Sequence, residues 1–209
     1  QKILQQGDLK HRLSRLFAVN LFWILVVFTG TGCVAQQRTL LALSKADHTL
    51  AIVSASTLKV ISRIPVGPDP HEVIASPDGK RAYVSIYGGG SLHEINVIDL
   101  VAQKPLLTVD TRPLFGPHGL AFADGKVWFS AEGSKAVGRY DPVTNKVDWC
   151  MGTGQDRSHM IYVTPDAKKI YTTNVNAGTV SILTSQDRPS DGAHREWKQT
   201  VVPVSKGSE

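Results

Sequence analysis

The sequence predicts an all-β fold made of repeated antiparallel sheets, and two observations lead to this prediction. Turn-forming residues recur about every eight to twelve positions, and the 209-residue chain holds 18 Gly and 11 Pro. The segments between turns are rich in β-branched and aromatic residues, and none after residue 35 has the apolar spacing of a helix. Many short strands separated by regular turns are typical of all-β repeat architectures.

Three copies of one motif define the repeat. They are His71–Ile86 (HEVIASPDGKRAYVSI), His118–Ala131 (HGLAFADGKVWFSA) and His159–Asn174 (HMIYVTPDAKKIYTTN). In each copy a His opens a short apolar strand, a turn containing Asp follows, and a second strand carries an aromatic residue. The His residues are 47 and 41 positions apart. Periods in the forties match one four-stranded blade of a β-propeller.

Each copy predicts a hairpin, because Pro presets φ for a tight turn and Gly accepts positive φ. The three turns are Pro77-Asp78-Gly79, Asp124-Gly125 and Pro165-Asp166. Residues 39–66 are expected to supply three strands before the first copy, and outer strands are expected at 95–100 and 179–183. The chain is therefore expected to consist of successive antiparallel sheets.

The repeats resemble known propeller families. Residues 70–85, with Asp78-Gly79-Lys80-Arg81-Ala82-Tyr83-Val84, resemble the YVTN-type β-propeller repeat, and Tyr171-Thr172-Thr173-Asn174 is close to the motif that names the family. Residues 116–147 resemble the repeats of streptogramin B lyase-like and gluconolactonase-like propellers. The matches cover about residues 39–185. This resemblance implies a propeller fold and a range of functions that includes lactonases, lyases, sensor domains and surface proteins.

Counting the repeats predicts part of a ring. Three clear units and a leading partial one give about three to four blades, whereas exported propellers of this type resemble rings of about seven. An open arc of blades exposes sheet edges and an unburied face. We therefore expect residues 36–209 to form a partial β-propeller, the N-terminal fragment of a seven-bladed ring.

Residues 1–35 are predicted to be a signal peptide. The basic segment KHRLSR precedes a largely apolar run of 13 residues, Leu16–Phe28, which small residues follow. A transmembrane helix needs about 20 apolar residues, so this run is too short to serve as one. Cleavage after Ala35 would release a soluble protein. The predicted location is the periplasm or the exterior of a bacterial cell envelope.

The two cysteines allow a second route of export. Gly30-Thr31-Gly32-Cys33 resembles a lipobox, in which Cys33 would carry a lipid anchor, and this is the predicted link to a membrane. Either route leaves Cys150 without an internal disulfide partner. An isolated Cys in a β-rich segment is usually buried, so Cys150 is expected in the core.

The charge pattern argues against nucleic acid as a partner. The formal net charge is +5, and residues 1–35 account for +3 of it through four basic residues and one Asp. The remaining surplus is weak, and its Lys and Arg are scattered among turns. Binding to phosphate backbones needs a clustered basic surface.

His71, His118 and His159 form the predicted site. Each lies where a connecting loop leads into the innermost strand, and equivalent positions in successive blades converge around the central axis. Imidazoles brought together can bind a divalent metal, the cofactor expected for such a site, or act as acid and base near neutral pH. The alternative is structural, with each His capping a turn or bonding to the neighbouring blade.

Four further residues are candidates for ligand binding. Glu72 and Glu132 lie near the same end as the histidines, where each could supply a carboxylate or remain a solvated loop charge. Arg157, in the loop before His159, could pair with an anionic ligand. Asn174 ends its strand and could contact a ligand or satisfy backbone groups at the turn.

Two functions follow from these patterns. The first is an exported scaffold in the cell envelope whose loops on one face bind a small molecule, a polymer or a protein. The second is a metal-assisted lactonase or lyase with a His-lined site at the channel mouth. The sequence has no G-x-S-x-G, CxxC or H-E-x-x-H motif and no phosphate-binding Gly loop before a helix. Because it also lacks a complete acid, base and metal set, the scaffold is the preferred hypothesis.

Overall fold

The computed structural model describes residues 38–186 and 196–208. The predicted signal peptide, its cleavage site and Cys33 lie outside this part of the chain. Within the described ranges, no helix has the length and apolarity needed to cross a bilayer.

The described residues form fifteen strands in four antiparallel sheets, and in every sheet the strands lie in chain order. The first sheet has three strands: β1 (Thr39–Ser44), β2 (Thr49–Ser54) and β3 (Val60–Pro65). The second has β4 (Pro70–Ala75), β5 (Arg81–Ile86), β6 (Glu94–Asp99) and β7 (Lys104–Asp110). The third has β8 (Pro117–Ala123), β9 (Lys126–Ala131), β10 (Ala136–Asp141) and β11 (Lys146–Gly152). The fourth has β12 (Ser158–Val163), β13 (Lys169–Asn174), β14 (Thr179–Gln186) and β15 (Glu196–Pro203).

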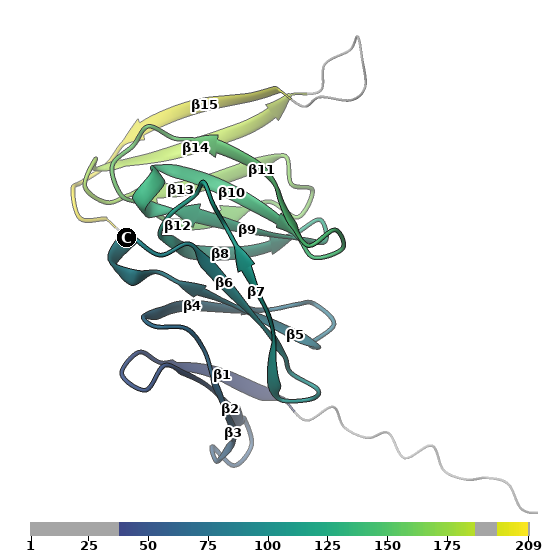
Figure 1. The fold of residues 1–209 in the computed structure, drawn as a ribbon. Coiled ribbons are helices and arrows are strands. Elements are labelled where there is room, and N and C mark those ends of the chain that lie inside the picture. Colours follow the sequence, from purple (N-terminus) through teal and green to yellow (C-terminus); the bar gives the residue numbers. More distant parts are fainter. Residues whose placement is uncertain (1–37, 187–195, 209) are drawn as a thin grey trace, which may run out of the picture. The chain divides into compact units, whose positions relative to one another are not determined.

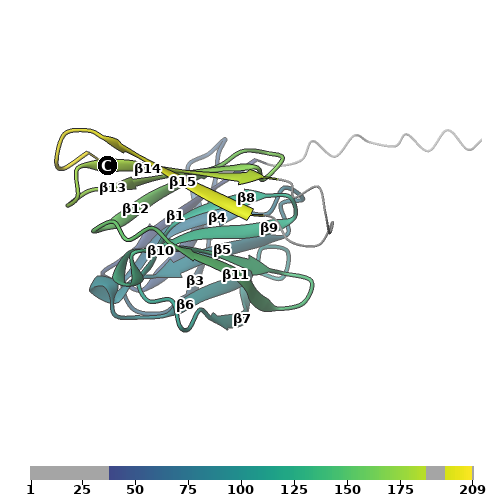
Figure 2. The ribbon, with the colours of Figure 1, turned by 90° about the horizontal axis from the view of Figure 1, so that it is seen from above.

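The four sheets follow one another, so the strands that open them become neighbours. β8 lies beside both β4 and β12, and β1 lies beside β4 (Figure 1). Viewed from above, the strands of successive sheets overlie one another (Figure 2). Each copy of the sequence motif is the first hairpin of its sheet, namely β4–β5, β8–β9 or β12–β13. The predicted all-β arrangement is confirmed.

The Asp of the repeat shapes the hairpin turn. In the first copy Asp78 Oδ1 accepts hydrogen bonds from Ser76 Oγ (2.5 Å) and the Lys80 N–H (3.1 Å). Asp166 accepts the corresponding pair in the third copy, at 2.6 and 3.1 Å. Gly79 takes the positive φ that follows, at 67°, whereas Ala167 takes it in the third copy, at 50°. The turn therefore depends on the side chain of Asp more than on Gly.

Each pair of neighbouring sheets encloses its own hydrophobic core. Leu50 and Ala82 lie in the core of the first and second sheets, and Tyr83 and Phe129 in that of the second and third. Trp128 packs with residues of the third and fourth sheets and is 1% exposed. Tyr140 lies in the core of the second and third sheets and is also 1% exposed.

Cys150 is not in the core. It lies on β11, the outer strand of its sheet, and is exposed. Alternate residues of β11 point to opposite faces, so Trp149 and Met151 pack against the core while Cys150 points away from it. The prediction of a buried Cys was wrong, because only one face of an outer strand packs against the core.

The outermost described sheets expose large apolar side chains. Leu40 on β1 is 52% exposed, and Met160 and Tyr162 on β12 are 37% and 59% exposed. Inner strands such as β8 lie between two sheets, whereas β12 has a described neighbouring sheet on one side only.

Replacing Gly138 with Ala is expected to destabilise the protein by about 1–3 kcal/mol, because overpacking a core forces side chains to shift. The new Cβ would overlap the Phe129 ring and would lie 2.5 Å from Leu114 Cδ1. Gly152→Ala, on the adjacent strand, is the matched control, since a Cβ there meets no atom within 4 Å. Guanidinium unfolding measures both variants, and equal stabilities would contradict this account of the packing.

Candidate functional site

The three repeat histidines lie in one row across the inner strands. His71, His118 and His159 are each the second residue of their strand, on β4, β8 and β12. The ring centroids of His71 and His118 are 4.0 Å apart, and those of His118 and His159 are 3.9 Å apart. Residues separated by more than forty positions in the sequence therefore form one row of imidazoles, tilted by 58° and 39° to one another.

A β-bulge places each His in the same way. On β4 the two residues His71 and Glu72 face a single residue of β5, Ser85, and the strand register shifts there. The same shift occurs between Pro117 and Leu120 and between Ser158 and Ile161. A bulge leaves a backbone N–H without its ladder partner and redirects the local side chains. This local irregularity turns the repeated His toward the neighbouring sheet.

A hydroxyl on the second strand satisfies the bulge and joins adjacent sheets. Ser85 Oγ accepts a hydrogen bond from the Glu72 N–H (3.0 Å) and donates one to the backbone oxygen of His118 (2.8 Å). Ser130 Oγ accepts from the Gly119 N–H (2.9 Å) and donates to the backbone oxygen of His159. We call these two arrangements the serine clasps. Each links one bulge to the His of the next sheet.

Gly119 allows the two inner strands to approach closely. A Cβ at this position would lie 2.8 Å from the backbone oxygen of His159 and 2.9 Å from the Ile161 N. Real Cβ atoms do not approach backbone atoms this closely, so only Gly fits between β8 and β12. Gly119 and the clasp serines were not among the residues predicted from the sequence. The signal was present, because the fifth residue of each second strand is a hydroxyl residue, namely Ser85, Ser130 or Thr173.

His118 is the most enclosed of the three rings. It is 2% exposed, and burial, with the nearby His159 as the next cause, lowers its pKa to about 3. Its imidazole is therefore neutral at physiological pH. Neither ring nitrogen has a hydrogen-bond partner among the described residues. Such unpartnered buried atoms are unusual and call for an explanation.

His71 has a different environment from the other two. Its Nδ1 lies 2.9 Å from Lys45 Nζ, and Lys45 in turn pairs with Asp69 at 2.8 Å. Burial lowers the pKa of His71, and the charge of Lys45 lowers it further. The side chain is 23% exposed. This ring therefore lies at the end of the row that contacts a cation.

Glu132 lies beside His118 and His159, and of its two predicted alternatives the structure excludes the solvated loop charge. The residue is 9% exposed, and its Oε1 accepts a hydrogen bond from Arg157 Nε at 2.6 Å. Its Oε2 has no hydrogen-bond partner in the described ranges, and the same is true of His159 Nδ1. One ligand atom from each of His118, Glu132 and His159 lies within 4.8 Å of the other two.

Close packing of two loops buries Glu132. Its backbone N–H donates to the Gly116 oxygen at 2.8 Å. A Cβ at Gly116 would lie 2.7 Å from Gly90 Cα, and a Cβ at Gly133 would overlap the backbone oxygen of Gly90. Gly90, Gly116 and Gly133 thus allow the loops of two sheets to pack closely around the carboxylate.

A polar pocket opens beside this carboxylate. It has a volume of about 250 Å³ and is lined by Tyr87, Gly89, Gly90, Glu132, Gly133, Lys135, Asp156, Arg157 and Asn176. Lys135 pairs with Asp156 at 3.1 Å. Burial and then the Glu132 carboxylate raise the pKa of Tyr87 to about 12, so its phenol stays protonated. The Tyr87 ring also packs edge-on against His118, with centroids 5.2 Å apart. The pocket therefore borders the imidazole row.

Glu72 and Asn174, the other two residues predicted to bind a ligand, have different surroundings. Burial raises the pKa of the Glu72 carboxyl, while the charge of His159 opposes that rise. Asn174 is 1% exposed, and its Oδ1 accepts a hydrogen bond from Ser158 Oγ at 2.9 Å. Its Nδ2 donates to Thr179 and Ser181 hydroxyls, each at 3.0 Å. The structure therefore places the Asn174 amide in a network within its own sheet.

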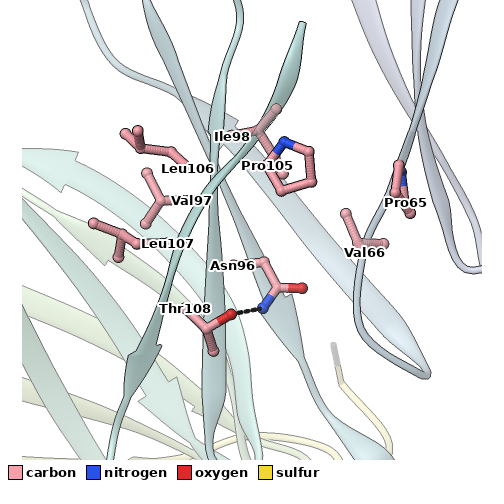
Figure 3. Close-up of a pocket in the computed structure, with 9 residues that line it drawn as sticks. All are labelled: Pro65, Val66, Asn96, Val97, Ile98, Pro105, Leu106, Leu107 and Thr108. Atoms are coloured by element: carbon pink, nitrogen blue, oxygen red, sulfur yellow. Dashed lines mark hydrogen bonds between the residues drawn. The ribbon is translucent and has the colours of Figure 1, made fainter.

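A larger pocket, of about 350 Å³, lies between the first and second sheets (Figure 3). It is lined by Pro65, Val66, Asn96, Val97, Ile98, Pro105, Leu106, Leu107 and Thr108. Asn96 Nδ2 donates to Thr108 Oγ1 at 3.1 Å, and Asn96 Oδ1 accepts from the Gly67 N–H at 2.6 Å. Its lining carries no ionisable side chain.

Solved structures resemble this arrangement of sheets. A functionally unknown protein from Desulfotomaculum acetoxidans superposes with a TM-score of 0.63 at 15% identity, covering 81% of this chain and 54% of that protein. The WD40 repeats of RRP9 give 0.60 at 17% identity, over 79% of this chain and 47% of that one. U3-55K superposes with a TM-score of 0.60 at 17% identity, covering 81% of this chain and 49% of that protein. The fold is a β-propeller.

Each sheet is therefore a blade, and the number of blades fits a partial propeller, as the repeats predicted. The chain spans about half the length of these solved structures. No protein-family model matches the chain, and no curated protein matches its sequence.

Replacing Ser130 with Ala is expected to lower the free energy of unfolding by about 2–4 kcal/mol. The change leaves a buried donor, the Gly119 N–H, and a buried acceptor, the His159 oxygen, without their shared partner. The control is Ser205→Ala, because Ser205 is exposed and bonds only within its own turn. Urea unfolding gives both values, and a loss equal to that of the control would refute the clasp.

Proposed function

We propose that this chain is a binding scaffold that takes a small polar molecule, or a polar side chain of a protein partner, at the His end of the propeller. The pocket beside Glu132 carries this proposal. Its lining combines both signs of charge, a phenol and an amide, which together can hydrogen-bond a polar ligand. At about 250 Å³ it is smaller than a typical drug-sized site of roughly 300–1,000 Å³.

The backbone of the pocket supports the same function. Gly89, Gly90 and Gly133 line it, so main-chain groups are accessible where side chains would otherwise cover them. Two ion pairs, Lys135 with Asp156 and Arg157 with Glu132, line the pocket. A ligand that carries both a hydrogen-bond donor and an acceptor would replace these ion pairs with hydrogen bonds to the same side chains.

The proposal extends to location and family. A basic segment, a 13-residue apolar run and a cleavage site after Ala35 favour export to a bacterial periplasm or exterior. Residues 70–85 and 171–174 favour membership of the YVTN-type propellers. The hairpins at these residues have the strand and turn positions that the motif predicts.

A metal-assisted lactonase or lyase is the second candidate. One observation favours it, the meeting of His118, Glu132 and His159 next to a polar pocket. Hydrolysis of a lactone panel in the presence of Zn²⁺ tests it, and turnover that persists in the double variant His118→Ala, His159→Ala would reject it.

Small polar compounds are expected to raise the melting temperature of the full chain, because a ligand that binds only the folded state stabilises it. A panel of amino acids, hydroxy acids and monosaccharides covers the chemistry of the pocket. Lys135→Ala should abolish the shift given by any active compound. Lys104→Ala, on the outer strand β7, is the control and should keep it.

Positions 135 and 104 also serve to test for a protein partner. A photoreactive amino acid at position 135 should cross-link to one partner in the cell envelope, and one at position 104 should not. The scaffold proposal fails if no compound stabilises the wild type and position 135 cross-links no more than position 104.

The exported chain is expected to begin at Gln36 when the sequence, preceded by an initiator Met, is expressed in a bacterium. Mass spectrometry of the periplasmic fraction measures this. Leu25→Arg should block export by interrupting the apolar run, whereas Cys33→Ser should leave cleavage after Ala35 unchanged. Loss of processing in Cys33→Ser would point to the lipoprotein route instead, and an intact cytoplasmic chain would refute export.

A further inference from the structure

We infer that His118, Glu132 and His159 bind one divalent transition-metal ion, with Zn²⁺ as the ion that fits best. This inference is independent of the proposed scaffold function. It differs from the prediction from sequence, in which the three repeat histidines are the ligands, because Glu132 takes the place of His71.

The three side chains already surround one point. Their ligand atoms lie within 4.8 Å of one another, whereas a tetrahedral ion with bonds of about 2.1 Å spaces its ligands about 3.4 Å apart. Small side-chain rotations close that difference. All three residues are at least nine-tenths buried, at 2%, 9% and 7% exposed. The site is therefore enclosed by protein and needs little rearrangement.

Unpartnered polar atoms mark the same point. Both ring nitrogens of His118, Oε2 of Glu132 and Nδ1 of His159 are buried without a hydrogen-bond partner in the described part of the chain. Buried polar atoms normally have partners, and several unsatisfied ones at one place imply a missing group. A cation would take one nitrogen from each imidazole and Oε2 of Glu132, because the unprotonated nitrogen of a neutral imidazole and a carboxylate oxygen are electron-pair donors, and the second nitrogen of His118 would keep its proton.

Neighbouring groups hold the ligands in place. Arg157 Nε donates to Oε1 of Glu132 at 2.6 Å, and Oε2 has no hydrogen-bond partner among the described residues. Hydrogen bonds to the outer oxygen of a ligating carboxylate are common around metal sites. The backbone oxygens of His118 and His159 are both fixed by the serine clasps. Both histidines and the carboxylate are thus positioned by separate contacts.

His71 is excluded from the ligand set by its surroundings. Its Nδ1 contacts the Lys45 ammonium at 2.9 Å, and a second cation beside that ammonium would be repelled. Its ring still contacts that of His118, with ring centroids 4.0 Å apart. His71 is therefore a matched control: it has the same residue type and the same repeat position, but it does not belong to the ligand group.

The donor set selects the kind of ion. Two imidazoles and one carboxylate suit Zn²⁺ and related transition metals, whereas Mg²⁺ and Ca²⁺ prefer oxygen ligands. Three protein ligands leave a coordination position for water or another molecule. The polar pocket shares Glu132 with this group, so a small ligand would have a route to that position.

Calorimetric titration of the EDTA-treated full chain with Zn²⁺ tests the inference, with Mg²⁺ as the control ion. We expect one Zn²⁺ per chain at this site and no comparable binding of Mg²⁺. His118→Gln, His159→Gln and Glu132→Gln should each weaken Zn²⁺ binding by more than about 100-fold, since even outer contacts are worth about 10–100-fold. His71→Gln should stay within about threefold of the wild type.

Two measurements separate loss of the site from loss of the fold. Near-ultraviolet circular dichroism in EDTA verifies that each variant is folded, and Co²⁺ added to the wild type should give the visible absorption bands of a four-coordinate site. Absence of stoichiometric Zn²⁺ binding by the wild type overturns the inference, as does a loss in His71→Gln equal to that in His118→Gln. Because the titration contains only metal, its failure would leave the binding of polar compounds unaffected.

Discussion

The contact between bulged inner strands is the constraint on which the rest of this structure depends. At each bulge two residues of an inner strand face one hydroxyl residue of the next strand. That hydroxyl accepts a hydrogen bond from the backbone N–H that the bulge leaves without a ladder partner. In Ser85 and Ser130 the same hydroxyl also bonds to the His backbone in the following blade. One side chain therefore satisfies the irregular backbone within its own blade and fixes the position of the next. Thr173 accepts the Met160 N–H in the same way at 3.2 Å.

This arrangement gives the site its geometry. Because each clasp holds the His backbone of the following blade, the tilted rings lie in contact, with centroids 3.9 to 4.0 Å apart. Gly119 lacks the Cβ that would separate the strands. Glycines in the adjoining loops allow those loops to pack closely, which places Glu132 beside the histidines. The arrangement of the polar side chains at this end of the propeller therefore rests on backbone packing. A change in that packing would move several functional groups at once.

The polar groups at this end oppose the stability of the fold. Burying imidazoles and a carboxylate without full sets of partners costs free energy, while the hydrophobic cores between blades supply the stabilisation. The two regions adjoin, since Phe129 and Ala131 of one core flank the clasp residue Ser130. Proteins keep such costly polar clusters mostly at sites that bind or react.

The sequence by itself determined the repeat, the hairpins with their Asp turns, and the equivalence of His71, His118 and His159. These features are local, because they follow from turn chemistry and from the strand period within each copy. Only the tertiary structure decided that Glu132 is buried beside two of the histidines, that His71 contacts Lys45, and that Cys150 faces away from the core. The reason is physical. Equivalent positions in a repeat share a local backbone, but the contacts of each side chain come from the next blade and its loops, where the copies differ in sequence.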